Sequence, residues 1–255
     1  MKTAFVTDVG KLREHNEDAG GVFVNKAGEY LAVVADGMGG HQAGDVASQI
    51  AKEMLETAWC SIDQSFTPQS AEEWLTNKIS DVNKAIFHRA QEERSLSGMG
   101  TTIVAALCTN HFVALAHVGD SRAYFITKEA LLLKTEDHSL VNELKKNGQI
   151  TEAEAENHPR KNVLIRALGT ERETKSESVV LGWEEGQGIL LCSDGLTNKL
   201  NSDELHEVML LNLPLPDQAQ KIVHMANERG GEDNITLALV LHEPQDEEGI
   251  TSCQN

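Results

Sequence analysis

The feature that most constrains the fold of this chain is an apolar run that meets an aspartate close to a glycine. Short apolar runs bounded by glycine are typical of buried β-strands. A single Asp-Gly pair is ordinarily a turn, but four aspartates, each attached to such a run, indicate strand ends that meet at one edge of a pair of sheets. The aspartates are Asp36, Asp120, Asp194 and Asp233, and the apolar runs beside them span residues 31–35, 114–118, 189–192 and 235–241.

Carboxylates gathered at one edge would repel one another, and divalent cations would neutralise them. The donors are all oxygen atoms, with no adjacent set of histidines or cysteines, and the calcium-binding loop Asp-x-Asp-x-Asp-Gly is absent. Hard oxygen ligands of this kind favour Mg²⁺ or Mn²⁺. Two such ions that share a carboxylate can hold a bridging water, lower its pKa and direct it at a phosphorus atom.

Charge and hydropathy exclude several other classes of function. The chain has 22 Lys and Arg against 40 Asp and Glu, a net charge of −18, which argues against nucleic acid and against an anionic membrane surface as partners. The start of the chain has no apolar segment of a secretory signal, and no apolar run is long enough to span a membrane. The four cysteines form no CxxC pair. We therefore expect a cytoplasmic protein.

The spacing of apolar residues predicts a layered fold. Three- and four-residue spacing predicts long helices in residues 43–58 and 75–90, and two shorter helices are expected at 202–211 and 216–229. Several short strands with short connectors lie between residues 101 and 133, which predicts antiparallel hairpins. Strands and helices in this order favour mostly antiparallel sheets covered by helices.

Two segments differ from the rest of the chain. Residues 137–168 combine a short predicted helix, a second helix-start signal and a polar, basic stretch at 158–162, which is typical of a surface insertion. The tail at 242–255 carries four acids and neither Lys nor Arg, and we expect it to be disordered. The sequence thus predicts one domain over residues 1–241.

The segment before the first aspartate motif contains a cation, Arg13, beside Glu17 and Asp18. An arginine among metal-binding carboxylates is expected where a phosphate must also bind, because its planar fork matches two phosphate oxygens. A surface ion pair is the alternative.

In their order along the chain, these motifs resemble those of the metal-dependent Ser/Thr protein phosphatases, the PPM or PP2C family, and in particular its bacterial branch. Each motif alone is weak, but their joint order and spacing are highly specific. The resemblance covers roughly residues 2–241. Its motifs are Arg13 with Asn16-Glu17-Asp18, Ala35-Asp36-Gly37-Met38-Gly39-Gly40-His41, Gly98-Met99-Gly100-Thr101-Thr102, Val118-Gly119-Asp120-Ser121-Arg122, Asp137-His138-Ser139, His158-Pro159-Arg160-Lys161-Asn162, Ser193-Asp194-Gly195-Leu196-Thr197 and Gly231-Glu232-Asp233-Asn234-Ile235-Thr236.

The resemblance implies an α+β fold, a layered α-β-β-α sandwich of two packed, mainly antiparallel sheets flanked by helices, with a flap insertion at about 137–168. It also implies two Mn²⁺ or Mg²⁺ ions in a cleft between the sheets, with a possible third ion. In its terms Asp36 bridges both metals and the carbonyl of Gly37 binds the first. The remaining metal residues are Asp194 and Asp233 on the second ion, Asp120 with Asp194 on the third, Asp18 and Glu17 acting mainly through metal-bound waters, and Asn234 beside the site.

The mechanism that follows is direct hydrolysis of phosphoserine or phosphothreonine by a metal-bridging hydroxide, with Arg13 gripping the phosphate. The leaving group needs a proton, from His41 or from a metal-bound water. His41 could instead begin a helix and hold its loop, because Met38 occupies the position at which the family's animal members have histidine. His138 is expected to position its loop, and His158 and Arg160 of the flap are candidates for substrate contact.

Two other functions remain open from the sequence. One is a hydrolase of small phosphoesters, and the other is a non-catalytic module that binds phosphoproteins on the same fold. The expected partners are phosphoserine and phosphothreonine proteins, a cognate Ser/Thr kinase and the substrates of that kinase. We expect the chain to act as a monomer.

Overall fold

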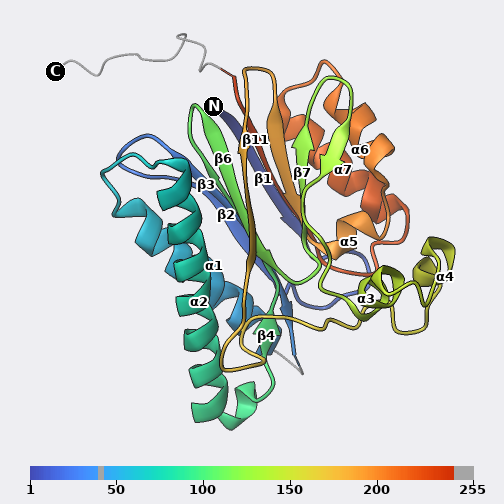
Figure 1. Cartoon of the computed structure of the whole chain (residues 1–255). Helices are drawn as coiled ribbons and strands as arrows, with labels where there is room; N and C mark the ends of the chain where they lie inside the picture. Colours follow the sequence, from blue (N-terminus) through green and yellow to red (C-terminus); the bar gives the residue numbers. More distant parts are fainter. Residues whose placement is uncertain (40–42, 244–255) are drawn as a thin grey trace.

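The computed structural model describes residues 1–39 and 43–243. They form two antiparallel sheets packed face to face, with helices on both outer faces (Figure 1). The predicted α-β-β-α sandwich is thereby confirmed. The predictions for His41 and for the tail from residue 244 onward lie outside the described residues.

The first sheet joins the two ends of the domain, because β1 pairs with β11 along its whole length. Helices α6 (Ser202–Met209) and α7 (Leu215–Glu228) cover its outer face (Figure 1). In spatial order its strands are β1 (Lys2–Asp8), β11 (Ile235–Leu241), β10 (Gly188–Cys192), β7 (Arg122–Ile126) and β8 (Leu131–Leu133).

The second sheet is covered by the two long helices, α1 (Ala43–Cys60) and α2 (Pro68–Glu92). Its strands are, in spatial order, β2 (Asp18–Val24), β3 (Tyr30–Met38), β5 (Ile103–Cys108), β6 (Phe112–Val118) and β9 (Glu177–Gly182), with β4 (Gly100–Thr101) paired to the end of β3. A short 3₁₀ turn, η1 (Arg94–Leu96), links α2 to β4.

The alternation of side chains along the strands divides the core into three layers. On β3, Leu31, Val33 and Ala35 face α1 and α2, whereas Ala32 and Val34 face the other sheet. The third layer packs α6 and α7 against the first sheet. Strands buried on both faces explain why the apolar runs in the sequence are continuous rather than alternating.

Helix α2 begins seven residues before the predicted segment 75–90. Thr67 caps it in a capping box with Ser70, and Pro68 occupies the first turn, where its missing N–H costs nothing. The sequence-based prediction followed only the apolar positions and therefore missed a polar first turn.

The strand predicted at 101–109 is interrupted at Thr102. There the hydroxyl of Thr102, rather than its carbonyl, accepts the N–H of Asp36 at 3.0 Å, while the Thr102 N–H still donates to the Asp36 carbonyl at 2.9 Å. The hydrogen-bond ladder therefore ends as β4 and β5, and Asp36 is held at the break.

The segment between β8 and β9 carries two short helices, α3 (Leu140–Lys146) and α4 (Glu152–Glu156), which project from one side of the sandwich (Figure 1). Ser139 caps α3 and Thr151 caps α4. No residue of α3 is buried. A further single turn, α5 (Asp194–Thr197), follows β10 directly and was not predicted.

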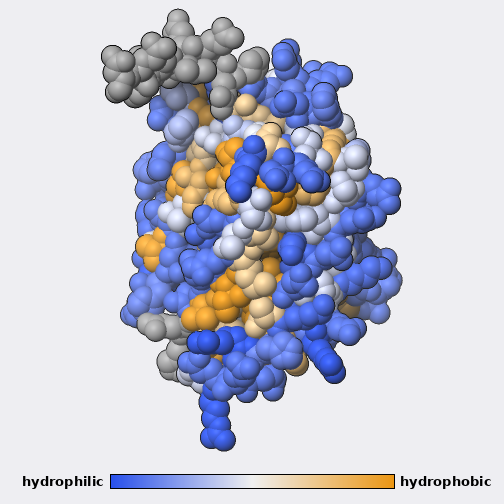
Figure 2. All heavy atoms as spheres, turned by 90° about the vertical axis from the view of Figure 1, so that its left-hand side faces the viewer, coloured by the Kyte–Doolittle hydropathy of each residue, from blue (hydrophilic) through white to orange (hydrophobic). Residues whose placement is uncertain are grey.

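Figure 2 shows the flank formed by the long helices, where hydrophilic side chains cover most of the surface and apolar ones appear between them. Within residues 1–39 and 43–243, no helix combines the length and the hydropathy needed to cross a bilayer.

Candidate metal centre

Five aspartates from separate strand ends meet at one edge of the two sheets. We call Asp18, Asp36, Asp120, Asp194 and Asp233 the acidic cluster. Asp18 starts β2 and lies directly opposite Asp36 of β3 in the antiparallel register. The turn from β6 to β7 holds Asp120, the turn after β10 holds Asp194, and Asp233 precedes β11. All four other aspartates act electrostatically on Asp36. The aspartates that the sequence places at strand ends therefore lie close together in the folded chain.

Hydroxyl groups beside the aspartates hold their turns together. The Thr102 hydroxyl that accepts the Asp36 N–H also contacts the Ser121 hydroxyl at 2.7 Å. Since Ser121 follows Asp120 directly, this chain of bonds fixes two turns of the acidic cluster relative to each other. The Thr102 and Ser121 side chains are both buried, so these hydrogen bonds are shielded from water.

A second hydroxyl links the two sheets. Ser193 Oγ donates to Asp18 Oδ2 at 2.8 Å and accepts the N–H of Thr236 at 3.0 Å. The Ser193 N–H donates to the Thr236 carbonyl at 3.0 Å. Ser193 thereby fixes Asp18 of the second sheet against β10 and β11 of the first.

The electrostatics of the acidic cluster are unfavourable without a counter-charge. Burial, opposed by hydrogen bonds from Thr236 and Ser193, raises the pKa of Asp18 to about 7. Burial and the neighbouring Asp194 raise the pKa of Asp120 to about 7. Burial, followed by the repulsion of Asp18 and Asp194, raises the pKa of Asp36 well above its ordinary value. In each case the charged form is disfavoured, as expected for carboxylates arranged to meet a cation.

The residues present fit hard divalent ions. Asp18 Oδ1 is buried and has no hydrogen-bond partner in the part of the chain that the structure describes, which is costly unless a ligand satisfies it. Only glycine fits at position 37, because a Cβ there would lie 2.1 Å from the Gly44 carbonyl oxygen and 2.5 Å from that of Glu17. The donors are all oxygen atoms, which suits Mg²⁺ or Mn²⁺.

Asn234 organises the N-terminal loop over the acidic cluster. Its Nδ2 donates to the carbonyls of Val9 and His15 at 2.9 and 3.0 Å, and its Oδ1 accepts the Glu17 N–H at 2.8 Å. All three bonds go to the backbone, so Asn234 orders the loop that carries Arg13 and Glu17.

Arg13 reaches from this loop to the acidic cluster. Its Nη2 lies 2.9 Å from the carboxylate of Asp233, and about half of the Arg13 side chain, 48%, is exposed. The ion pair predicted as the alternative for Arg13 is therefore present. A guanidinium carries five N–H donors, so the pair leaves donors for an anion at the exposed side. Burial raises the pKa of Glu17, and Arg13 opposes that shift.

A cleft of about 490 Å³ opens beside the acidic cluster, between α5 and the segment that carries α3 and α4. Asp120 and Asp194 line it, as do Lys161 and Asn162. Among the described residues, His158 and Arg160 are not part of this lining. The Arg160 N–H instead donates to His158 Nδ1 at 3.1 Å within their own turn.

Sequence reasoning missed the residues that hold the aspartates in place. Ser121 and Ser193 each stand next to an aspartate in the motifs, and that adjacency was the available signal, whereas Thr102 stands between Thr101 and Ile103. What the sequence did not contain was the pairing, since Thr102 and Asp36 are 66 residues apart and Ser193 and Asp18 are 175 apart.

Comparison with known proteins places the chain in a family. The family model described as protein phosphatase 2C matches residues 11–238. The serine/threonine phosphatase stp of Listeria monocytogenes is 47% identical over 240 residues, covering 94% of this chain and 95% of that protein. A bacterial serine phosphatase crystal structure superposes with a TM-score of 0.91 at 37% identity, covering 96% of this chain and 99% of that one.

A third comparison concerns the metal. The catalytic domain of the serine/threonine protein phosphatase PstP, solved in complex with two manganese ions, has a TM-score of 0.81 to this chain at 30% identity, with coverage of 93% and 96%. The chain belongs to the protein phosphatase 2C family, whose members are metal-dependent enzymes. The predicted resemblance is confirmed.

Proposed function

We propose that this chain hydrolyses phosphoserine and phosphothreonine monoesters on proteins, using two Mn²⁺ or Mg²⁺ ions held by the acidic cluster. It is a protein serine/threonine phosphatase. The observation that carries the proposal is the acidic cluster itself, in which five strand-end aspartates meet around the unpartnered Asp18 Oδ1, with Arg13 beside them.

The ligand assignments follow from position. Asp36 is central, since all four other aspartates of the acidic cluster act on it, and we assign it to both ions. The Gly37 carbonyl is assigned to the first ion, Asp194 and Asp233 to the second, and Asp120 with Asp194 to a third. Asp18 and Glu17 act mainly through water, and Asn234 orders the loop around them.

When bound, the ions supply an activated water as the nucleophile and neutralise charge on the phosphate. The role of the chain is to orient the phosphate and to keep the carboxylates ionised. Arg13 binds phosphate oxygens with the donors that Asp233 does not use. Because Asp233 holds Nη2, the guanidinium is oriented before the substrate arrives, which lowers the entropy cost of binding.

The leaving serine or threonine alkoxide needs a proton. We assign this proton to His41 or to a water at the metals, and the two sources predict different results. If His41 is the donor, His41→Gln lowers kcat for phosphopeptides while a substrate with an acidic leaving group, p-nitrophenyl phosphate, is turned over at nearly the wild-type rate. If water is the donor, His41→Gln changes kcat for both substrates to the same extent.

The cleft beside the acidic cluster suits the peptide around the phosphorylated residue. We propose that residues 137–168 form a flap subdomain on a single phosphatase domain that spans residues 1–241, with 242–255 as a disordered tail. Lys161 lines the cleft, and the neighbouring His158 and Arg160 are proposed to contact substrate as it enters.

The alternatives are less favoured. A non-catalytic module on this fold would be expected to lack some of the metal carboxylates, whereas this chain has the five aspartates of the acidic cluster and Glu17 on the loop beside them. The cleft of about 490 Å³ is also within the size range of small-molecule sites, so the preference for a protein substrate rests on the relatives. Comparing kcat/KM for a phosphothreonine peptide with that for a nucleotide separates this alternative from the proposal.

The biological setting extends the same proposal. We infer that the chain acts in the cytoplasm, as a monomer, and opposes a cognate Ser/Thr kinase by dephosphorylating that kinase and its substrates. Phosphoproteomics of a strain lacking the protein, followed by dephosphorylation of the resulting hits with the purified chain, tests the partners.

The direct test is phosphate release from a phosphothreonine peptide. Purified chain stripped of metal should be inactive, and Mn²⁺ or Mg²⁺ should restore turnover. Recovery with Zn²⁺ alone would contradict the argument from hard oxygen ligands. Full activity of the metal-stripped chain would contradict the metal centre altogether.

A further inference from the structure

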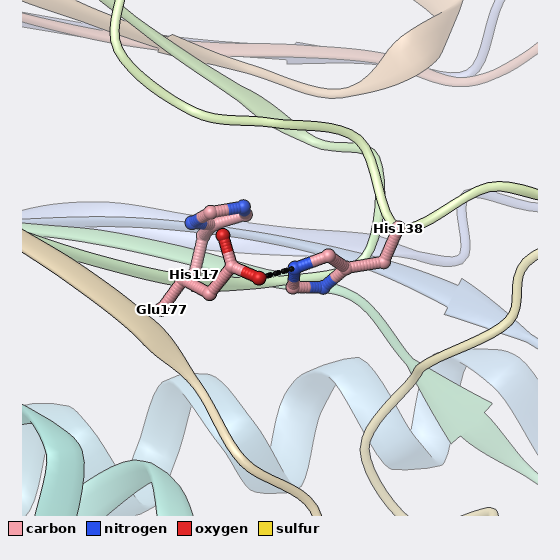
Figure 3. Close-up of side chains that lie close together, drawn as sticks. All are labelled: His117, His138 and Glu177. Carbon is pink, nitrogen blue, oxygen red and sulfur yellow. Dashed lines mark ion pairs between the residues drawn. The ribbon is translucent and has the colours of Figure 1, made fainter. Parts of the chain in front are cut away.

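A second group of ionisable side chains lies close to the acidic cluster. We call His117, His138 and Glu177 the histidine cluster (Figure 3). His117 of β6 and Glu177 of β9 are register partners in the second sheet, and His138 comes from the loop before α3. The two imidazole rings stack with centroids 4.7 Å apart and an interplanar angle of 19°. Both histidines are buried, with His138 only 3% exposed.

A metal site is the obvious interpretation, since one ligand atom from each residue lies within 4.8 Å of the others. Hydrogen bonds argue against it. His138 Nδ1 accepts the Gly119 N–H at 3.1 Å, so in the neutral ring the proton must sit on Nε2. A metal on Nε2 would require the proton on Nδ1, where it would face the Gly119 N–H.

With Nδ1 bonded to Gly119, the other ring nitrogen of His138 faces Glu177. Nε2 lies 3.1 Å from Glu177 Oε1 in an ion-pair contact whose alignment falls short of a hydrogen bond (Figure 3). Arg166 Nη1 also lies 3.1 Å from Glu177 Oε1. The carboxylate thus faces the protonated edge of the ring, which stabilises the tautomer that leaves Nδ1 free to accept.

His138 holds Gly119, the residue directly before the predicted metal ligand Asp120. Gly119 has a φ of +108°, and a Cβ there would lie 2.6 Å from Thr102 Cγ2, so only glycine fits the turn. Both backbone polar groups of Gly119 are used by His138. Its N–H donates to Nδ1, and its carbonyl accepts the His138 N–H at 2.9 Å. His138 therefore holds the backbone of the turn that presents Asp120, in addition to the bond between Ser121 and Thr102.

His138 also connects this turn to the far end of the proposed flap. The Ile165 N–H donates to the His138 carbonyl at 2.9 Å, and Ser139 and Leu164 form a bridge next to it. The Asp120 turn, the start of the segment 137–168 and its return are thus joined at one residue.

We propose that His138 is a positioning residue, which fixes Asp120 for metal binding through the bond from Gly119 N–H to Nδ1. This inference rests on the proposed function for the identity of the metal centre. It adds a second role for histidine in the site, distinct from proton donation, and it predicts that the acceptor atom at Nδ1 is what matters.

Two substitutions separate the ring nitrogens. In His138→Asn the side-chain oxygen lies near the place of Nδ1 and can accept the Gly119 N–H. In His138→Gln the amide reaches toward the place of Nε2 and the acceptor near the backbone is lost. The matched control is His117→Gln, which also breaks the stacked ring pair but keeps a donor for the Glu136 carbonyl that His117 Nε2 contacts at 2.9 Å.

The measurement is equilibrium binding of Mn²⁺ to each purified chain, with the Gly119 amide proton shift recorded by NMR in the metal-free state. His138→Gln should weaken Mn²⁺ binding about tenfold at the third site, which we assign to Asp120 and Asp194. The His138→Asn and His117→Gln variants should bind Mn²⁺ as the wild type does. In an Asp120→Asn background, the loss caused by His138→Gln should disappear, because the interaction it removes acts through Asp120.

Equal losses for Asn and Gln at 138, or a full loss that persists in the Asp120→Asn background, would overturn the proposal. Should His138→Gln fail to fold, His138→Asn decides alone, with wild-type Mn²⁺ binding supporting the proposal and a tenfold loss contradicting it. Binding is measured without turnover, so these outcomes are independent of whether the wild-type chain dephosphorylates a peptide.

Discussion

The acidic cluster and the histidine cluster lie at the same edge of the sandwich, yet they are built on opposite principles. In the acidic cluster like charges face one another, and Asp18 Oδ1 is buried without a partner among the described residues. In the histidine cluster the contacts are complementary. His138 Nδ1 accepts from Gly119, His117 Nε2 meets a backbone carbonyl, and Glu177 faces both His138 and Arg166.

The difference teaches how to distinguish a binding site from a positioning device. Buried polar groups that lack partners point to a ligand that supplies them. Buried polar groups that face an opposite charge or a hydrogen-bond partner rigidify the structure around them. In the histidine cluster His138 Nε2 has no hydrogen bond among the described residues, but it faces the Glu177 carboxylate at 3.1 Å. Residue type alone does not make this distinction, since two histidines and a glutamate also form a familiar metal-binding set.

The contrast between the two clusters would fail most clearly if the acidic cluster tolerated substitution. We expect Asp36→Asn to reduce phosphate release by about a thousandfold or more, because both ions would lose the carboxylate that we assign to them. The metal-free variant should nevertheless melt at a higher temperature than the metal-free wild type, since the repulsion on Asp36 is removed. Phosphopeptide turnover and thermal unfolding in chelator measure the two effects.

The matched control is Asp63→Asn, which removes the same charge from an exposed loop after α1. It should change neither quantity. Activity of Asp36→Asn within tenfold of the wild type would show that the acidic cluster is not the metal centre.

Acidity should weaken Mn²⁺ binding at the acidic cluster. The pKa values of Asp18 and Asp120 are each raised to about 7, so below pH 7 a proton competes with the ion for each carboxylate. The affinity should fall about tenfold for every pH unit below 7 and for every proton displaced. Calorimetry at pH 6 and pH 8, in buffers of different ionisation enthalpy, measures the affinity and the protons released. Identical affinities at the two pH values would contradict the charge arrangement of the acidic cluster.

Substitution of Arg13 tests whether the edge of the acidic cluster binds substrate. Arg13→Ala should raise KM about tenfold with a smaller effect on kcat, because it removes charge-assisted bonds to phosphate that exist before the reaction. Lys11→Ala is the control, since Lys11 stands on the same loop but pairs with Glu228 at 3.1 Å. A loss confined to kcat would mean that Arg13 acts on the transition state alone.

The smallest expected effect is on the stability of the metal-free chain. The two clusters should make this stability depend on pH in opposite directions. Asp18 holds its proton more tightly in the folded chain, because its pKa is raised from 3.8 to about 7, so its contribution falls as the pH rises through that window. Burial and the nearby His117 lower the pKa of His138 below 6.5, so its contribution falls as the pH decreases below 6.5.

Thermal unfolding in chelator from pH 5 to pH 8 separates the two contributions. Asp18→Asn should flatten the loss toward high pH, and His138→Asn the loss toward low pH, each by up to about 1.4 kcal/mol per pH unit. Slopes that stay unchanged in both variants would show that neither group titrates with folding.

Much of the fold was predictable because its strands are buried on both faces. The runs that form β3, β6, β10 and β11 are predominantly apolar, and the sequence predicts a strand at each of them. The polar first turn of α2 and the one-turn helix α5 were missed, because capping and tertiary contacts rather than apolar spacing define them. The break at Thr102 was also missed, since it depends on one side chain replacing a carbonyl as acceptor.

By itself, the sequence determined which chemistry is possible at this edge. Aspartates at the ends of apolar strands, without histidine or cysteine beside them, select hard divalent ions, because ligand type and strand periodicity are local properties. Only the tertiary structure decided which groups hold these aspartates and which nitrogen of His138 accepts a hydrogen bond. Those outcomes depend on contacts between residues far apart in the chain, such as Ser193 with Asp18, and on the tautomer that the Gly119 N–H imposes on His138.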